Sequence, residues 1–83
     1  MNAEELIQGA LRSGKYLLGS RRTIKALKSG KAKAVIIAKN CPEKFLVEIK
    51  KFNTPIYTFE GTNMELGAKF GKPFSVAALV ILE

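Results

Sequence analysis

The sequence predicts one α/β domain over residues 1–83, with a mostly parallel or mixed sheet and helices on both of its faces. Helical and strand patterns alternate along the whole chain, and this order is typical of a sheet covered by helices. Hydrophobic residues make up 47% of the 83 residues, so the chain can bury a core. The length suits one small domain rather than two.

The first half of the chain contains two expected helices, each followed by a strand. Residues 2–13 are expected to be helical, with Asn2 as the N-terminal cap and a glycine after the last turn. The short apolar segment "KYLLG" is an expected strand. The second helix is expected over residues 20–29, with Gly19 and Ser20 as its turn and cap. The β-branched run "KAVIIAK" that follows is typical of a buried strand.

The third helix is expected to begin at Asn40 and to run to about Phe52. Glu43 stands three residues after Asn40, in the manner of a capping box, and Pro42 is tolerated in a first turn. The segment "PIYTF" is the next expected strand. Pro55 at its start lacks an amide hydrogen, which suits a strand end or the edge of a sheet.

The fourth helix carries the clearest local signal in the chain. Thr62 and Glu65 have the T-x-x-E spacing of a capping box, and apolar residues continue at helical spacing to Phe70. The last segment, "SVAALVIL", is the most apolar of the expected strands, and we therefore expect it at the centre of the sheet.

Ligands of alternating α/β folds gather at the loops beyond the carboxyl ends of the strands. In this chain those loops are residues 19–22, 39–42 and 60–62 and the tail after Leu82. Three of the four lead into the start of a helix, where exposed amide groups favour anions.

Positive charge is concentrated in the first half of the chain. The formal net charge is +7. Residues 1–42 hold nine Lys or Arg against Glu4 and Glu5, whereas residues 43–83 hold five of each sign, and no acid occurs from Leu6 to Pro42. Ordinary soluble surfaces mix the two signs. A long one-signed stretch therefore predicts a polyanionic partner, the alternative being a merely solubilising surface.

The sequence argues against an enzyme. It contains no histidine and no aspartate, which excludes a Ser-His-Asp triad and an imidazole zinc site, and it has no glycine-rich phosphate loop. Cys41, at an expected helix start, could be a nucleophile of lowered pKa, but no general base is available to it. Glu60 and Glu65 could form a carboxylate pair, but Glu65 is better explained by the capping box. We expect no catalytic residue, no metal and no cofactor.

Composition also predicts where the protein resides. A lone cysteine excludes an internal disulfide and suits a reducing compartment, so we expect a cytoplasmic protein. The longest strongly apolar run, residues 76–82, is far short of the roughly 20 residues of a membrane helix. The first residues lack the apolar segment of a signal peptide.

The second expected helix combines an apolar face with a basic flank. At 100° per residue, its four cations fall within an arc of about 120°. Ile24 and Leu27 point elsewhere, toward the sheet. A solvated surface is the alternative interpretation, but no acid lies at helical spacing to neutralise the flank. The planar guanidinium of arginine suits phosphates and guanine edges. The four cations are Arg21, Arg22, Lys25 and Lys28.

Two further positions could contact a nucleic acid. In the loop "GKPFSV", Lys72 and Phe74 combine a cation with an aromatic ring, an arrangement on which unpaired bases stack. The alternative is that Phe74 closes the core above the last strand. The amide of Asn40 could bind a base edge, or it could simply cap the third helix.

These segments resemble a known family. The runs "GKYLLGSRRTIKALKSGKAKAVIIAKNCP" and "IYTFEGTNMELGAKFGKPFSVAALVIL" are similar to the L30e family of large-subunit ribosomal proteins, within the kink-turn RNA-binding superfamily. The resemblance covers nearly the whole chain. It implies a three-layer α/β/α sandwich around a four-stranded mixed sheet. It also implies binding to an internal loop of structured RNA that bends sharply at tandem G·A pairs.

The resemblance further implies that three neighbouring loops hold the RNA. Gly19 would let the backbone approach, Arg21 would take a guanine edge or a phosphate, and Phe74 would stack on an extruded base. Sister members of the superfamily carry Asn-Glu where this chain has Arg21 and Arg22, which places the chain nearer the L30e branch. The complete implied set is Gly19, Ser20, Arg21, Asn40, Phe74 and Val76, with Arg22, Lys25, Lys39 and Lys72 as an electrostatic rim.

Together these observations predict a structural RNA-binding constituent of the large ribosomal subunit. Its expected partners are structured rRNA containing a kink-turn and other ribosomal proteins. We expect no membrane association, and we expect the free protein to be a monomer. One alternative is a stand-alone kink-turn binder in RNA processing or regulation. An alternative of another class is a small α/β enzyme or nucleotide binder. The absence of histidine, aspartate and a glycine-rich phosphate loop disfavours this alternative.

Overall fold

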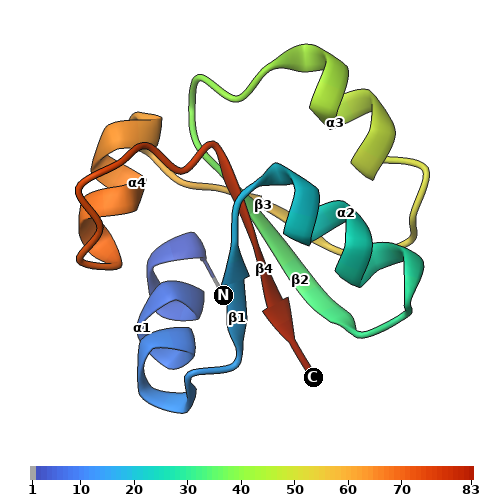
Figure 1. The fold of residues 1–83 in the computed structure, drawn as a ribbon, viewed down its shortest axis with the longest axis horizontal. Coiled ribbons are helices and arrows are strands. Elements are labelled where there is room, and N and C mark those ends of the chain that lie inside the picture. The colour runs from blue at the N-terminus through green and yellow to red at the C-terminus, as the bar shows by residue number, and fades with distance from the viewer. Residues whose placement is uncertain (1) are drawn as a thin grey trace.

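The computed structural model describes residues 2–83 and contains four helices and four strands in strict alternation. Figure 1 shows the strands side by side in one sheet, with the helices around it. The expected order of elements is confirmed. The elements are α1 (Ala3–Ser13), β1 (Tyr16–Leu18), α2 (Ser20–Lys28), β2 (Ala32–Ile37), α3 (Glu43–Ile49), β3 (Ile56–Thr58), α4 (Asn63–Lys69) and β4 (Ala78–Leu82).

The sheet is mixed, with the strand order β1-β4-β2-β3. Strands β2 and β3 are parallel, whereas β4 is antiparallel to both of its neighbours, β1 and β2. The expected central place of the last strand is confirmed. Strand β3 forms an edge, as Pro55 suggested, and the Pro55 carbonyl accepts a hydrogen bond from the Val35 amide at 2.9 Å.

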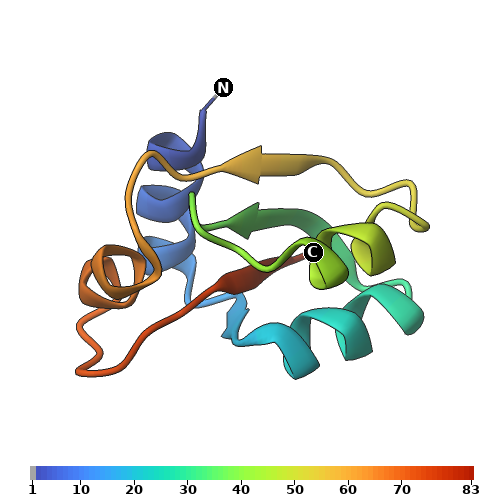
Figure 2. The same cartoon turned by 90° about the horizontal axis from the view of Figure 1, so that it is seen from above.

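The helices form two layers, one on each face of the sheet. Helices α1 and α4 cover one face and α2 and α3 cover the other, as Figure 2 shows from above. Successive side chains of a strand point to opposite faces, so β2 sends Ile36 to the first layer and Val35 and Ile37 to the second. The continuous apolar run of β2 thus fills two cores. The three-layer sandwich implied by the family resemblance is confirmed.

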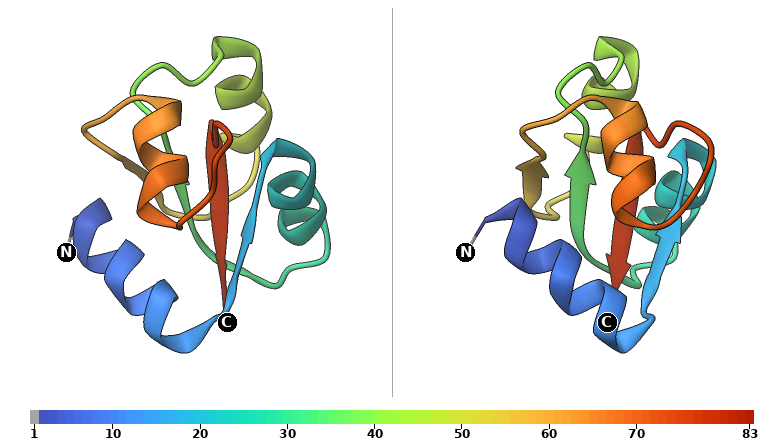
Figure 3. Two further views of the ribbon diagram at one scale, coloured as in Figure 1. Left: turned by 60° about the vertical axis from the view of Figure 1, so that its left-hand side comes forward. Right: turned by 90° about the vertical axis from the view of Figure 1, so that its left-hand side faces the viewer.

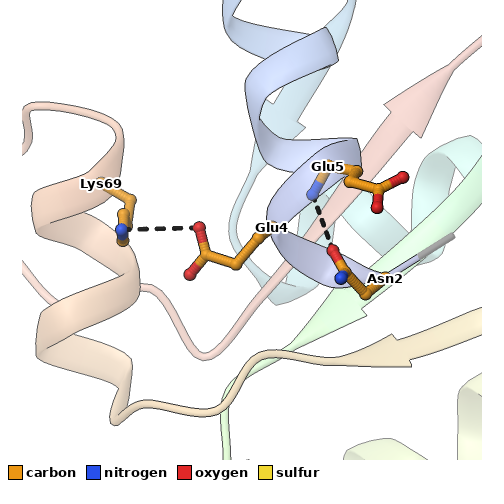
Figure 4. A network of polar contacts seen from close by, with 4 residues as sticks. All are labelled: Asn2, Glu4, Glu5 and Lys69. Atoms are coloured by element: carbon orange, nitrogen blue, oxygen red, sulfur yellow. Dashed lines mark hydrogen bonds and ion pairs between the residues drawn. The ribbon is translucent and has the colours of Figure 1, made fainter.

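Local capping signals explain how two of the helices begin. The Glu5 amide donates to Asn2 Oδ1 at 3.0 Å at the start of α1. An ion pair of 3.5 Å between Glu4 and Lys69 links α1 to α4 (Figure 4). Both side chains of this pair are about half exposed, so it contributes only a few tenths of a kcal/mol.

The capping box of α4 is present as expected. Thr62 Oγ1 accepts from the Glu65 amide at 3.3 Å, and Glu65 Oε1 accepts from the Thr62 amide at 3.5 Å. We expect Thr62→Ala to destabilise the fold by about 1 kcal/mol, because a helix amide loses its acceptor. The midpoint of thermal unfolding should fall by roughly 4–8 °C. Thr62→Ser keeps the hydroxyl and is the control; an equal loss in both variants would contradict this role.

The expected start of the third helix is wrong. Helix α3 begins at Glu43, its N-cap is Pro42, and no side chain caps it. The residue before a proline avoids the helical region of backbone conformations, so Cys41 cannot belong to the helix. Asn40 therefore cannot act as the cap. The helix also ends at Ile49, and Phe52 lies in a tight turn, with its amide donating to the Ile49 carbonyl at 3.2 Å.

The tail after Leu82 does not join the other predicted ligand loops. Strand β4 runs opposite to β1, β2 and β3, so its carboxyl end lies at the opposite end of the sheet from theirs, as both views of Figure 3 show. The Leu82 amide donates to the Lys15 carbonyl at 3.0 Å, beside the start of β1. The segment that leads into β4, residues 70–77, takes the tail's expected place. Within residues 2–83 no helix has the length and apolar character needed to cross a membrane.

Candidate nucleic-acid interface

Four loops meet at one end of the sheet. They follow β1, β2 and β3 and precede β4, because the first three strands share one direction and β4 runs against them. Hydrogen bonds between backbone atoms join the loops in pairs. The Gly19 amide donates to the Ala78 carbonyl, the Ala38 amide donates to the Ala77 carbonyl, and the Lys39 amide donates to the Gly61 carbonyl, each at 2.9 Å. The loops are therefore held in fixed positions relative to one another.

The loop after β1 presents an open helix start. Gly19 has φ +105° and ψ 155° and is itself the N-cap of α2, so the expectation that Ser20 caps this helix is wrong. Its carbonyl accepts from the Thr23 hydroxyl at 2.8 Å and from the Thr23 amide at 3.1 Å. No side chain caps α2, and its first three amides have no acceptor within residues 2–83. Such a helix start favours a bound anion.

The basic flank of α2 is exposed as expected. Arg21, Arg22, Lys25 and Lys28 are all exposed, and none of them forms an ion pair in the described part of the chain. The two arginines face different sides of the helix. Arg21 lines a shallow groove with Phe45 and Glu48 of α3, whereas Arg22 lines a groove beside β1. Of the two arginines, only Arg21 therefore lies toward the side of α2 that faces α3.

Asn40 links two of the loops. Its Oδ1 accepts from the Asn63 amide at 2.9 Å, and its Nδ2 donates to Asn63 Oδ1 at 3.3 Å. The Asn40 side chain thus satisfies the first amide of α4, not the start of the third helix. The remaining N–H of the Asn40 amide has no partner among residues 2–83 and is free to donate to a ligand.

The segment before β4 presents Phe74 to solvent. The Phe74 side chain is 54% exposed, so the alternative that it closes the core is wrong. Val76 is only 2% exposed and packs in the core beneath α1 and α4, so its side chain cannot touch a ligand. The Val76 amide donates to the Asn63 carbonyl at 2.9 Å, and this residue therefore positions the segment instead. Lys39 and Lys72 are exposed near these loops.

Two residues that the sequence analysis missed shape this end of the molecule. Asn63 binds both the Asn40 side chain and the backbone of Val76. Gly67, inside α4, lies so close to the Phe74 carbonyl that an added Cβ would stand 2.1 Å from its oxygen. A glycine within a helical pattern often marks a close approach, so this signal was present in the sequence.

The other groups considered for catalysis do not gather into a site. Burial raises the pKa of the half-buried Cys41 thiol, the direction opposite to that of an activated nucleophile. Glu65 is engaged in the capping box with Thr62. No cluster of three metal-ligating side chains occurs among residues 2–83.

A family model described as the ribosomal protein L7Ae/L30e/S12e/Gadd45 family matches residues 1–83. The chain belongs to this family. The resemblance seen in the sequence motifs is therefore confirmed.

Archaeal relatives in the L30e branch of this family are similar over nearly their full length. The large ribosomal subunit protein eL30 of Archaeoglobus fulgidus is 55% identical over 80 residues, which cover 96% of this chain and 93% of that protein. The eL30 protein of Methanothermobacter thermautotrophicus is 45% identical over 85 residues, which cover 98% of this chain and 87% of that protein.

Solved structures share the fold of this family member. A 15.5 kD RNA-binding protein of Giardia lamblia superposes with a TM-score of 0.75 at 18% identity, over 94% of this chain and 68% of that one. A Bacillus halodurans protein of unknown function superposes with a TM-score of 0.76 at 22% identity, over 94% of this chain and 81% of that one. At these identities the likeness concerns the fold alone.

Proposed function

We propose that the chain is an RNA-binding structural constituent of the large ribosomal subunit and that it recognises a kink-turn or internal loop of rRNA. One observation carries the proposal: the open start of α2, the exposed Arg21 and the exposed Phe74 ring belong to loops that meet at one end of the sheet. The full-length similarity to proteins named eL30 supports the ribosomal part.

Each loop has a distinct role in this proposal. Gly19 carries no side chain and lets a phosphate approach the first amides of α2, among them that of Ser20. Arg21 binds a guanine edge or a phosphate with its planar guanidinium. Phe74 stacks on an extruded base, and Asn40 holds two loops together while offering its free N–H.

Four exposed cations around these loops supply attraction that does not depend on sequence. They are attracted by the negative potential of the RNA backbone and displace its condensed counterions on binding. Because they contact charge rather than base edges, they set affinity and its salt dependence more than specificity. These cations are Arg22, Lys25, Lys39 and Lys72.

We place the protein in the cytoplasm as part of the ribosome, with rRNA and other ribosomal proteins as its partners and no catalytic role. In a sucrose gradient of a cell lysate, the tagged chain should sediment with large subunits. Sedimentation only with free RNA or as free protein would favour a stand-alone kink-turn binder.

The two arginines give the sharpest test of RNA recognition. We expect the protein to prefer a kinked RNA over a straight duplex of equal length. Arg21→Ala should weaken binding to the kinked RNA by about tenfold, because a specific bidentate contact is worth roughly 1–3 kcal/mol. Arg22→Ala should weaken binding to both RNAs by less and should reduce the salt slope by about one. Affinities are measured by fluorescence anisotropy across a salt series.

The same titrations contain their controls. A few phosphate contacts predict a log–log salt slope of roughly −3 to −5 for the unmodified protein. Equal affinity for the kinked RNA and the duplex would contradict specific recognition and leave only a basic surface. Equal losses in the two variants would contradict the distinct role of Arg21.

A further inference from the structure

Strand β1 is a free edge of the sheet, outside the proposed RNA site. It pairs with β4 on one side only. Hydrogen-bonded pairs alternate along an antiparallel ladder, and here they involve Lys15 with Leu82 and Gly19 with Ala78. Tyr16 and Leu18 therefore direct their amide and carbonyl groups away from the sheet. Among residues 2–83 no group bonds to these four backbone atoms.

A groove of about 480 Å³ lies beside this edge, between β1 and α2. Three apolar side chains that are buried or half-buried line it: Leu17, Ala26 and Leu82. Three exposed cations line it as well, and within residues 2–83 none of them is in an ion pair. These are Arg22, Lys25 and Lys31.

We propose that this edge and groove together bind an acidic, extended peptide segment of another protein, which adds to the sheet as a fifth strand. Unpaired backbone groups at an edge are the usual template for such an addition. The groove takes side chains from alternate positions of the added strand, since the residue opposite Leu17 points to the same face as Leu17. The groove shares Arg22 and Lys25 with the cations proposed to attract RNA, whereas Lys31 and the backbone of Tyr16 and Leu18 have no part in the proposed RNA contacts.

Charge and surface chemistry select this occupant over two others. A second copy of the chain would bring its own net charge of +7 and its own three cations to the same edge, which opposes pairing. An RNA strand has no regular row of amide and carbonyl groups to match Tyr16 and Leu18. A peptide that carries both apolar and carboxylate side chains at its groove-facing alternate positions matches the edge, the apolar lining and the cations at once.

The test uses the whole 83-residue chain and the eight-residue peptide Val-Thr-Glu-Thr-Val-Thr-Glu-Thr, with blocked ends and a fluorescent label. One face of this peptide, when extended, carries both Val and Glu. We expect measurable binding by anisotropy at low salt. A Gln-for-Glu peptide and a peptide N-methylated at alternate residues should each bind at least fivefold more weakly. In hydrogen exchange followed by NMR, the amides of Tyr16 and Leu18 should exchange at least tenfold more slowly in the complex. The Leu17 amide, which faces β4, is the internal reference.

A matched pair of charge reversals locates the site without touching the proposed RNA contacts. Lys31→Glu, in the groove, should weaken peptide binding by about fivefold to tenfold. Lys28→Glu makes the same charge change on the α3 side of α2 and should weaken it less than twofold. Equal effects of the two variants, or binding without protection of Tyr16 and Leu18, would overturn the proposal.

The other occupants give different results. A dimer seen by sedimentation, with Tyr16 and Leu18 protected in the absence of peptide, would assign the edge to a second copy. A kinked RNA that protects these two amides and displaces the peptide would assign it to RNA. Either outcome would overturn the proposal that the edge binds an acidic peptide.

Discussion

Gly67→Ala should destabilise the protein by about 2–3 kcal/mol, because the added Cβ would stand 2.1 Å from the Phe74 carbonyl oxygen. The contact joins two backbones, so no flexible side chain can move aside to relieve it. Either α4 or the segment before β4 must shift by about an ångström, and the Lys72 amide, which donates to the Gly67 carbonyl at 3.0 Å, must shift with it.

This prediction is measured by thermal and urea unfolding, with an expected fall of roughly 10–20 °C in the unfolding midpoint. Gly9→Ala is the matched control, since Gly9 is an exposed glycine inside α1 with no atom within 4 Å of an added Cβ. That change should stabilise the fold by about 0.5–1 kcal/mol through helix propensity. A Gly67→Ala variant as stable as the unmodified protein would show that the two backbones are not in contact.

The same variant has a consequence for RNA binding. Phe74 lies on the segment that must retreat, so its exposed ring moves relative to Arg21. Affinity for the kinked RNA should therefore fall even at temperatures where Gly67→Ala remains folded, whereas Gly9→Ala should bind normally.

Gly19→Ala should cost about 2 kcal/mol of stability and should also weaken binding to the kinked RNA. Gly19 has φ +105° with ψ 155°, a backbone conformation that is essentially restricted to glycine. Space is not the cause, since nothing lies within 4 Å of an added Cβ. Relief of the strain must rotate the backbone at the start of α2, which turns the open amides and Arg21 away from their positions.

Gly30→Ala is the control for this second prediction. Gly30 also has a positive φ, +75°, and open space around it, but it follows α2 rather than preceding it. Its replacement should cost about 1 kcal/mol and leave RNA affinity unchanged. A similar fall in RNA affinity in both variants would show that general destabilisation, and not the geometry at Gly19, is responsible.

The features that the sequence predicted correctly depend on near neighbours in the chain. Asn2 and Thr62 cap their helices with partners three residues away, and apolar patterns together with cap and turn signals identified every helix and strand. The error at the third helix was also local, since Pro42 restricts Cys41. The proline by itself therefore predicts a helix that begins after Cys41.

The features that could not be predicted depend on distant partners. The direction of β4 is set by pairing with β1, more than 60 residues earlier, so the prediction placed the tail after Leu82 at the wrong end of the sheet. Asn40 bonds to Asn63, 23 residues later, and not to the neighbouring helix. The different surroundings of Arg21 and Arg22 likewise emerge only when α3 and β1 are in place.

Most of the bonds that hold the loops of the proposed RNA site together run between main-chain atoms, at Gly19, Ala38 and Lys39, and the Asn40 side chain adds two more. Replacing an exposed side chain such as Arg21 or Phe74 leaves all of these bonds intact. Scaffold and specificity can therefore diverge separately. A lineage built on this scaffold could exchange its target RNA through a few surface substitutions, each neutral for folding, without passing through an unstable intermediate sequence.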